Sequence, residues 1–412
     1  MRCLIHDFAG HPFQVQLSRE LARRGHHVTH AYPFGLDGPK GRLTPSPNDS
    51  ATLDILGIPL SGSFRKYSAW RRLAAQRIYA RDVKRLISSR HFDVMISGNT
   101  PIDVQAELLW YCKAKEIGFV HWVQDVYSQA IRFFLERKVG AFAAPVSYPF
   151  LKLEQWVATR ADAAVAIAPA FADILAGWGV PRRGISVIEN WAPLDEVRPL
   201  PRINEWSMEH GLNEKTVFLY SGTLGMKHRP DLLYHLAKSL KNNCKLVVVT
   251  EGIGREYLRK LPPLDTIQFL DFQPYDQLPM VLASADVLVA TLESDAGQFA
   301  VPSKVLSYMC AGRPLLLAAP AINLAAAVVR RSRAGIVANP DSPEDVCAAA
   351  QDLSTDLFLR SSLGASARRY AEREFNISRI AFRFEEVLLG SVPARARVEG
   401  VVDRRRSQGA GD

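Results

Sequence analysis

The feature that most constrains this chain is a repeated rhythm of short apolar runs, each followed by a longer segment of mixed or amphipathic character. The first pair is residues 2–5, expected to form a strand, and residues 12–26, expected to form a helix that stops at Gly25. Such an alternation predicts a parallel sheet with helices on both faces. Further strands of this half are expected at residues 27–32, 93–97, 119–123, 163–167 and 185–188.

The rhythm restarts after residues 189–205, a connector with three prolines and several charges. A chain of 412 residues exceeds one core of roughly 250–300 residues, so two domains are expected. We predict an α/β protein with two doubly wound, Rossmann-like domains, residues 1–195 and 196–388, whose last helix can pack back on the first domain. Residues 389–412 are expected to be a disordered basic tail. The second-half strands are expected at residues 216–221, 245–250, 267–272, 286–291, 314–318 and 335–338.

The composition of the chain limits the compartment and the binding partners that can be expected. The five cysteines are scattered without a CxxC pair, which indicates reduced thiols in a cytosolic protein and no zinc site. The first residues are too polar for a signal peptide, and no run of 18 apolar residues predicts a membrane span. The net charge of +9 calls for an anionic partner: nucleic acid, a membrane or a phosphorylated substrate. Nucleic acid is not expected, because no recognition motif is present.

Three strand–helix junctions of the second half suit an anion. In the stretch YSGTLGMKH (220–228), Gly222 and Gly225 let the backbone approach a ligand closely, and Lys227 adds a positive charge. The stretch TEGIGREYLRKL (250–261) repeats the arrangement with Gly252. An ordinary tight turn is the alternative for both stretches, and the second stretch favours it.

The third junction is FAVPSKVLSYMCAGRPLLL (299–317). Ser303 offers a hydroxyl and Lys304 a full charge at the start of an expected helix, whose free amides and dipole favour an anion. A well-capped structural helix is the alternative. Ligands of open parallel sheets bind beyond the carboxyl ends of the strands, so the expected site is a cleft between the two domains.

These stretches resemble the retaining GT-B glycosyltransferases of family 4 (group 1), in particular the bacterial branch that builds surface polysaccharides with fucosamine-type and colanic-acid-type transferases. The resemblance covers about residues 1–388 and is most specific in the second half. It implies a GT-B fold, two Rossmann-like domains facing a central cleft. It also implies transfer from a nucleotide-diphosphate sugar, acting as co-substrate without a further cofactor or metal, to a lipid-linked or other saccharide acceptor.

The resemblance also assigns site residues. It places the acceptor in the first domain, with Gly10 near the donor phosphates and Asp125 as an acidic, catalytic position. Donor and diphosphate binding falls to Gly222, Thr223, Lys227, Gly252, Ser303, Lys304 and Ser307, with Lys227 and Lys304 stabilising the charge that develops on the leaving diphosphate.

The chain departs from the family in one place. Many members carry two glutamates spaced E-x7-E; here Ser307 occupies the second position, the first falls near Phe299, and Glu293 lies too early to match. Two alternatives therefore stay open: a degenerate GT-B-like subunit that binds a nucleotide or partner without turnover, and a GT-B epimerase.

A basic segment, residues 64–92, carries nine Lys or Arg residues and one acid. An amphipathic basic helix of this kind can lie on an anionic membrane, which predicts a peripheral protein on the inner face of the cell membrane. An ordinary surface helix is the alternative, and residues 137–156 have a similar composition. The expected membrane-binding residues are Trp70, Arg71, Arg72, Arg77 and Arg81, with Tyr79 as an additional interfacial aromatic.

Overall fold

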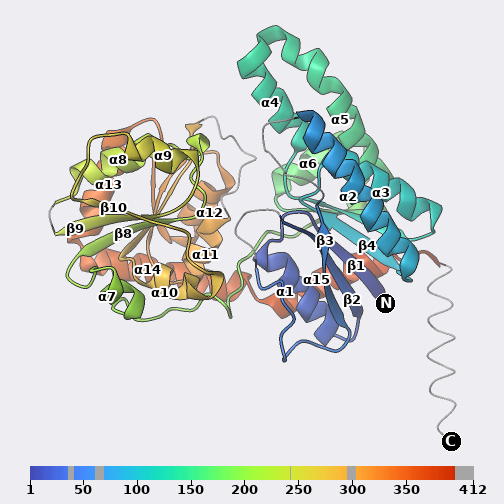
Figure 1. Ribbon diagram of the computed structural model, residues 1–412, viewed down its shortest axis with the longest axis horizontal. Helices are drawn as coiled ribbons and strands as arrows, with labels where there is room; N and C mark the ends of the chain where they lie inside the picture. Colours follow the sequence, from blue (N-terminus) through green and yellow to red (C-terminus); the bar gives the residue numbers. More distant parts are fainter. Residues whose placement is uncertain (36–40, 61–68, 242, 295–302, 395–412) are drawn as a thin grey trace, which may run out of the picture. The chain divides into compact units, whose positions relative to one another are not determined.

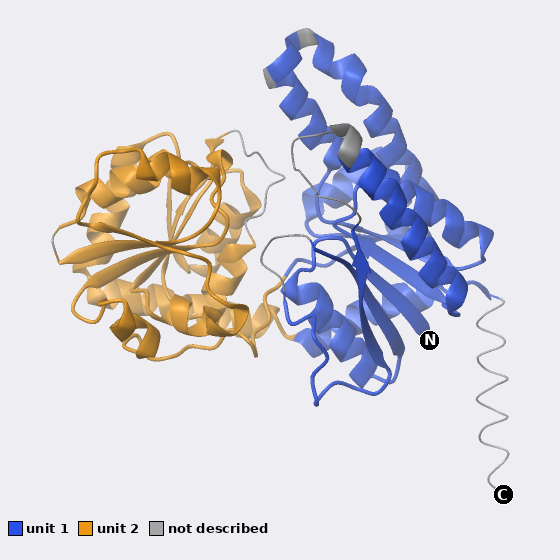
Figure 2. Cartoon of the chain, viewed as in Figure 1, with its two compact units in different colours: residues 1–190, 377–412 blue, residues 191–376 orange. Residues whose placement is uncertain are grey.

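The computed structural model describes residues 1–35, 41–60, 69–241, 243–294 and 303–394 of the chain. Two compact units make up the fold, each described by itself (Figures 1 and 2). Unit 1 comprises residues 1–190 together with the segment that begins at Ile377, and unit 2 comprises residues 191–376. The units divide at Asn190–Trp191, whereas the sequence predicted a boundary at residue 195, and the final helix is part of unit 1.

Unit 1 is an alternation of strands and helices. Its strands are β1 (Arg2–Asp7), β2 (His27–Phe34), β3 (Leu53–Pro59), β4 (Val94–Gly98), β5 (Gly118–Val123), β6 (Ala163–Ala166) and β7 (Ile185–Val187). Its helices are α1 (Pro12–Arg23), α2 (Ala69–Ser89), α3 (Ile102–Ala114), α4 (Tyr127–Val139), η1 (Gly140–Phe142), α5 (Ala143–Arg160), α6 (Pro169–Gly177), η2 (Arg182–Gly184) and α15 (Ile377–Ser391).

The sheet of unit 1 is parallel throughout the described strands, in the order β3-β2-β1-β4-β5-β6-β7. Helices α2, α3 and α5 cover one face, where residues such as Leu4, Met95 and Phe119 pack against them. On the other face α15 contacts β4, β5 and α1 (Figure 1). Because helices cover both faces, β4 and β5 are buried at every position, as expected for central parallel strands.

Helix α15 returns from the end of the chain to complete unit 1. The Glu385 carboxylate accepts hydrogen bonds from Arg24 Nε at 2.9 Å and from His26 Nε2 at 2.6 Å, next to the end of α1. The ring of Phe384 lies 4.7 Å from that of Trp122 on β5. The helix extends to Ser391, so residues 389–391, predicted to belong to a disordered tail, are helical; residues 395–412 lie outside the described residues.

Unit 2 repeats the pattern. Its strands are β8 (Thr216–Ser221), β9 (Cys244–Val249), β10 (Ile267–Leu270), β11 (Val287–Thr291), β12 (Leu315–Ala318) and β13 (Gly335–Ala338). Its helices are α7 (Glu205–Glu209), η3 (Met226–His228), α8 (Pro230–Ser239), α9 (Ile253–Arg259), η4 (Tyr275–Gln277), α10 (Leu278–Ala283), α11 (Lys304–Cys310), α12 (Leu324–Ser332), α13 (Pro343–Thr355) and α14 (Leu357–Glu374).

The strand order of unit 2, β10-β9-β8-β11-β12-β13, is the Rossmann order 3-2-1-4-5-6. Unit 1 has the same order with one further strand at its edge. In such a sheet the direction of winding reverses between the first and fourth strands, here β8 and β11, and the loops that leave these strands diverge to opposite faces. This switch point is where open parallel sheets bind their ligands.

The structure of unit 1 differs from the sequence predictions in two places. Strand β3 was not predicted, because Leu53–Pro59 carries an aspartate and a glycine and is only half-buried at the sheet edge. Tyr79 was expected at a membrane interface, but it is fully buried, and its hydroxyl is 2.9 Å from Nε2 of the buried His6.

The basic segment forms helix α2 from Ala69 onward, and residues 61–68 lie outside the described residues. Arg72, Arg77 and Arg81 are exposed, whereas the side chains of Trp70 and Arg71 are not among those described. In the described part of the chain, no helix is long and apolar enough to cross a membrane.

Candidate functional site

The candidate site lies where β8 ends. Residues 222–225, called the first loop below, leave the strand with Gly222 at φ +125°, a conformation that L side chains rarely adopt. The hydroxyl of Tyr308 on α11 receives a hydrogen bond from Ser221 N at 2.9 Å and donates one to Ser221 O at 3.1 Å. These two bonds attach α11 to the end of β8.

Lys304, the first residue of α11, places its ammonium group under this loop. A Cβ atom added to Gly222 would lie 3.3 Å from both Cε and Nζ of Lys304. The Nζ atom stands 3.6 Å from the centroid of the Tyr220 ring, which gives a cation–π contact. The residue as a whole is partly exposed, but Nζ itself is buried, and no hydrogen-bond acceptor for it is found among the described residues.

A buried ammonium group with three unused donors is unfavourable without an anion. Burial lowers the pKa of Lys304 well below its usual range, and the nearby charge of Lys227 lowers that pKa further. The same surroundings act on His228: burial, Lys304 and Lys227 lower its pKa to about 3, so this imidazole is neutral near pH 7. Its Nδ1 accepts the Gly225 N–H at 3.0 Å, which places the ring proton on Nε2.

The amides of the first loop are mostly occupied. Gly222 N donates to Val249 O at 3.1 Å and Leu224 N donates to Glu251 O at 3.2 Å, while Gly225 N is held by His228. Of the four amides, Thr223 N is the one for which the described residues show no acceptor. Within the first loop, the expected backbone cradle thus reduces to one amide.

A second segment, residues 250–254, which includes the start of α9, contacts the first loop and supports it. Leu224 O accepts the Gly254 N–H at 2.9 Å, and Thr250 Oγ1 donates to Gly222 O at 2.6 Å. Gly252 lies at φ +108°, and a Cβ atom added to it would lie 3.2 Å from Leu224 O, which is a tight contact. The two glycine-containing junctions predicted from the sequence are therefore joined in a single structure, in which Gly252 is exposed and belongs to the supporting segment.

The other predicted donor residues lie around Lys304. Thr223 and Lys227 are exposed, the latter in η3. Ser303 is exposed and caps α11 without a side-chain hydrogen bond, and Ser307 is half-buried one turn later on the same helix. The Phe299 position, where the family's first glutamate falls, lies outside the described residues. Glu293 follows β11, and its N–H donates to Lys227 O at 2.9 Å.

The two predicted residues of unit 1 lie on loops that follow its strands. Gly10 comes after β1 at φ +75° and is buried. The loop is shaped by Asp7, whose carboxylate accepts hydrogen bonds from Ala9 N at 2.9 Å and His11 N at 2.6 Å. Asp125 is exposed after β5. The expectation that Gly10 approaches the donor phosphates involves both units and stays a prediction.

Sequence reasoning missed three residues of these sites: Tyr220, His228 and Asp7. Tyr220 appeared to be one of several apolar strand residues, although its ring forms the floor under Lys304. His228 stands directly after Lys227, but the sequence does not show that its ring turns back to the Gly225 amide. The position of Asp7 at the end of the first strand was the one available signal, because carboxyl ends of parallel strands carry functional groups.

Solved structures with the same fold cover nearly the whole chain. Anabaena Alr3699/HepE in complex with UDP and glucose aligns with a TM-score of 0.68 at 14% identity, covering 94% of this chain and 99% of that one. Sucrose-phosphate synthase from Thermosynechococcus elongatus aligns with a TM-score of 0.68 at 15% identity, covering 94% and 98%. These likenesses and the two parallel-sheet domains define the GT-B fold.

Sequence comparisons match a different family model in each half of the chain. Residues 14–196 match the family model "Glycosyltransferase Family 4", and residues 215–356 match "Glycosyl transferases group 1". The chain thus carries a segment similar to glycosyltransferase family 4, followed by a segment similar to the glycosyl transferases of group 1.

Two relatives carry similar names. The putative glycosyltransferase YtcC of Bacillus subtilis is 29% identical over 196 residues, 43% of this chain and 46% of the relative. The putative colanic acid biosynthesis glycosyl transferase WcaI of Escherichia coli is 23% identical over 214 residues, 50% and 52%. The chain therefore matches about half the length of these relatives.

Proposed function

We propose that this protein transfers a sugar from a nucleotide-diphosphate sugar to a saccharide acceptor. The observation that carries the proposal is the buried Lys304 ammonium group, which has no acceptor among the described residues and lies at the switch point of the Rossmann-like sheet. A bound diphosphate would supply the missing acceptor. Structural neighbours were solved with UDP and with UDP-glucose, so uridine diphosphate sugars are the first donors to test.

The donor half of the reaction needs stabilisation of the leaving diphosphate. When the bond between the anomeric carbon and the phosphate oxygen breaks, negative charge accumulates on the diphosphate. Lys304 and Lys227 would offset that charge in a site from which water is partly excluded, where such interactions are strong. Because both cations are supplied by the chain, we propose that turnover needs no tightly bound metal and no cofactor.

We assign the acceptor half to unit 1. Asp125 would contact the attacking hydroxyl of the acceptor, and Gly10 would leave room for the donor phosphates. The transfer is proposed to retain the anomeric configuration, with the hydroxyl approaching from the face that the diphosphate leaves. This assignment rests on the resemblance to the family.

The acceptor class is proposed from two further observations. One relative is named for colanic acid biosynthesis, a surface polysaccharide, and the chain carries a net charge of +9. A lipid-linked saccharide acceptor at the cytoplasmic face of an anionic membrane would explain both the polysaccharide role of that relative and the positive charge of this chain. On this proposal the protein is cytoplasmic and peripheral to the membrane. Its attachment to the membrane is strengthened by five residues of α2: Trp70, Arg71, Arg72, Arg77 and Arg81.

The two alternatives make different predictions. A degenerate subunit that binds only a protein partner would have no need for a buried, costly ammonium group, so Lys304 favours an anion site. A subunit that binds the nucleotide without turnover would respond to nucleotide in a thermal-shift assay but would transfer no sugar. A GT-B epimerase would interconvert nucleotide sugars without an acceptor. Incubation with a donor alone, followed by chromatography of the nucleotide sugars, distinguishes the epimerase from the transferase.

The experiment that tests the proposal is a thermal-shift screen with UDP, GDP, ADP, CDP and dTDP and their sugar conjugates. A selective ligand at about a hundredfold excess over Kd stabilises the native protein by about 2.7 kcal/mol. We expect one diphosphate to raise the melting temperature of the parent and of Lys238→Ala, a control at an exposed lysine of unit 2, but not of Lys304→Ala. No shift with any nucleotide would refute the donor site.

A further inference from the structure

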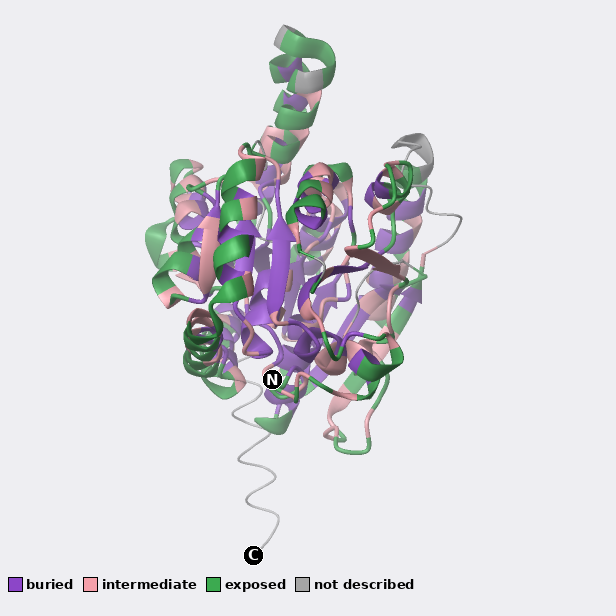
Figure 3. Ribbon diagram, turned by 90° about the vertical axis from the view of Figure 1, so that its left-hand side faces the viewer, coloured by how far each residue is buried: buried purple, intermediate pink, exposed green. Residues whose placement is uncertain are grey.

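The most unusual surface of the molecule is a helical hairpin in unit 1 formed by α4, η1 and α5. The two helices pack against each other and project beyond the sheet and its covering helices (Figures 1 and 3). At its base the hairpin is held firmly, because the buried Glu154 accepts the N–H groups of Tyr127 at 2.8 Å and Ser128 at 2.9 Å. One helix thus caps the start of the other.

The outer part of this hairpin exposes large apolar side chains instead of burying them. Figure 3 shows its projecting end as mainly exposed. Phe142 in η1 is 72% exposed, more than most large apolar side chains of the described chain. We call the following exposed residues the hairpin tip: Phe134, Val139, Phe142, Val146, Tyr148 and Phe150. Several large apolar side chains exposed together on one projecting element indicate an interaction surface.

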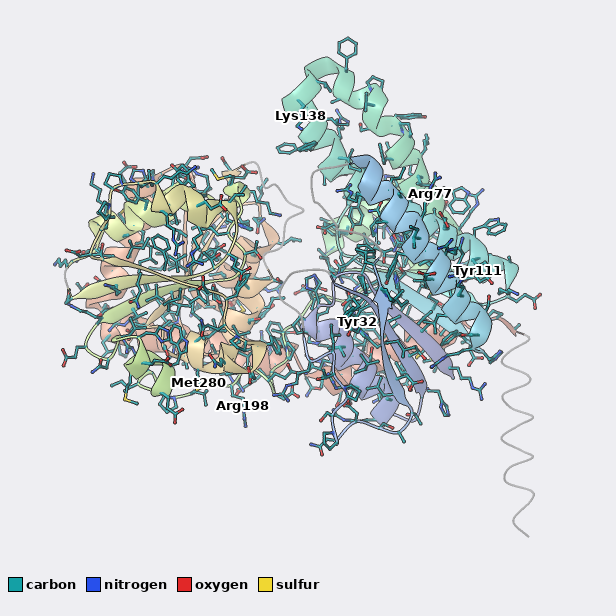
Figure 4. All side chains as sticks on the ribbon, viewed as in Figure 1. Tyr32, Arg77, Tyr111, Lys138, Arg198 and Met280 are labelled. Carbon is teal, nitrogen blue, oxygen red and sulfur yellow. The ribbon has the colours of Figure 1, made fainter. Side chains whose placement is uncertain are left out.

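Cations accompany the apolar residues. Lys138, labelled in Figure 4, lies over the ring of Phe134 at 4.5 Å, and Lys152 lies over the ring of Tyr148 at 5.2 Å. Arg132 pairs with Glu136, which is the one acidic residue of the sequence between Tyr127 and Leu153. Apolar and aromatic side chains edged by lysines are the composition of segments that lie at a membrane surface.

We infer that the hairpin tip inserts into the interface of an anionic membrane. Aromatic rings favour the headgroup region, where their apolar body is buried and polar groups stay hydrated. The lysines next to them would meet lipid phosphates and add electrostatic attraction to the anionic surface. The inference deepens the proposed function on which it rests, since it names the part of the chain that brings the enzyme to a lipid-linked acceptor.

A membrane fits this tip better than a second copy of the chain. A two-fold interface brings the same patch of both copies together, so the cations of one tip would face the cations of the other. Glu136 is already paired within its own helix and offers little compensation. An anionic bilayer complements the charge without such repulsion.

Helix α2, the element expected from the sequence to bind membrane, differs from the hairpin tip. It exposes Arg72, Arg77 and Arg81, but its apolar stripe, including Tyr79, Val83 and Ile87, packs into the core of unit 1 (Figure 4 labels Arg77). Among its described large apolar residues, only Leu73 is exposed, at 37%. The helix can therefore add electrostatic attraction, whereas the hairpin supplies the apolar anchor.

The test compares two triple variants of the full-length protein by co-sedimentation with vesicles of phosphatidylglycerol and phosphatidylethanolamine. The tip variant carries Phe134→Ser, Phe142→Ser and Tyr148→Ser. The control carries Ile203→Ser, Met208→Ser and Phe358→Ser, three exposed apolar positions of unit 2. We expect about a tenfold or greater loss of vesicle affinity for the tip variant and none for the control, because burial of apolar groups drives insertion. Equal binding of both variants would overturn the inference.

Insertion itself is measured with a probe at the tip. In a Cys347→Ser background the four remaining cysteines are buried, so Phe142→Cys can be labelled selectively with nitrobenzoxadiazole. We expect a blue shift and brighter emission with anionic vesicles, but no change for the same label at Ile322→Cys in unit 2. An unchanged spectrum at position 142, or self-association that the tip variant abolishes, would identify a different partner and overturn the inference.

A further readout separates this inference from the proposed function. The nucleotide-induced thermal shift of the tip variant should equal that of the parent, because the hairpin lies in unit 1 and the donor residues lie in unit 2. If nucleotides bind and vesicles do not, only the membrane inference fails. If vesicles bind through the tip and no nucleotide binds, only the proposed function fails.

Discussion

The ammonium nitrogen of Lys304 lies 3.6 Å from the centroid of the Tyr220 ring, beneath Gly222 and without a hydrogen-bond acceptor among the described residues. The aromatic face compensates part of the charge but accepts no conventional hydrogen bond. The site is thus organised for an anion before any ligand arrives. An enzyme benefits from such preorganisation, because the donors need no rearrangement when charge develops on the leaving group.

The first prediction concerns this lysine in catalysis. Lys304→Ala should lower turnover by about 10²–10³-fold, or about 2.7–4 kcal/mol, if the ammonium group stabilises the departing diphosphate. Lys227→Ala, at an exposed position, should have a smaller effect. Steady-state kinetics with the donor found in the thermal-shift screen provide the measurement, with Lys238→Ala as the control; unchanged kinetics in both site variants would rule out the assignment.

The same lysine predicts a pH dependence of stability. Burial lowers the pKa of Lys304, so between that lowered pKa and the ordinary value of about 10.4 the unfolded chain binds more protons than the folded chain. The free energy of unfolding of the ligand-free protein should therefore rise with pH across this window. Urea unfolding from about pH 7 to about pH 10 measures the slope.

Lys304→Met is the matched variant for that experiment. Its side chain keeps a similar length without the charge, so the ligand-free protein should become more stable near pH 7 and lose the Lys304 contribution to the slope. The gap between variant and parent should narrow as the pH rises. A gap that stays constant with pH would show that the lysine is not held in a buried, charge-disfavouring place.

Gly254 tests the support of the first loop. A Cβ atom at this position would lie 2.6 Å from Leu224 Cγ and 2.7 Å from Leu224 O. Gly254→Ala should destabilise the protein by about 1–3 kcal/mol and weaken nucleotide binding, because Leu224 must move and carries the loop with it. Gly184→Ala, where no atom lies within 4 Å of the added Cβ, is the control and should change stability by less than about 0.5 kcal/mol.

Asp125 tests the acceptor half. Asp125→Asn keeps the size of an exposed side chain and removes its charge. If the carboxylate assists the attacking hydroxyl, turnover should fall by about 10²–10⁴-fold while donor affinity and melting temperature remain near those of the parent. Asp173→Asn, another exposed aspartate of unit 1, is the control. Full activity of Asp125→Asn would remove this residue from the mechanism.

Glu385 tests how the final helix completes unit 1. Burial alone would raise the pKa of this carboxyl, but hydrogen bonds and charges from Arg24 and His26 lower it overall. Glu385→Gln should cost about 1–3 kcal/mol near neutral pH, since charged hydrogen bonds are lost. This stabilisation is present above the unfolded pKa of about 4.3 and disappears as the pH falls through the lowered folded pKa.

Urea unfolding of the full-length protein at several pH values checks the prediction. The parent and Glu385→Gln should converge in acid and separate near neutral pH. Glu372→Gln, an exposed glutamate paired with Arg368, serves as control and should cost less than about 1 kcal/mol. An equal effect of the two substitutions would mean that the Glu385 contacts do not hold α15 in place.

Much of the architecture is predictable from local pattern. Apolar runs such as Val94–Gly98 and Gly118–Val123 are buried at every position, so periodicity and length were sufficient to identify them. The strand Leu53–Pro59 was missed because an edge strand is half-exposed and its sequence is less apolar. The glycines at positions 222 and 252 were informative because their backbone conformations are rarely adopted by other residues.

By itself, the sequence determined the two series of strands and helices, the connector between them and the glycine- and lysine-containing junctions, because these depend on neighbours along the chain. Tertiary structure alone decided that Nζ of Lys304 is buried against Tyr220, that Tyr79 faces the core, and that α15 returns to unit 1. Burial and pairing of these side chains depend on residues far away in sequence. Local sequence patterns do not identify such distant neighbours. The packing of the folded chain determines which charged groups are solvated and which are buried without a partner.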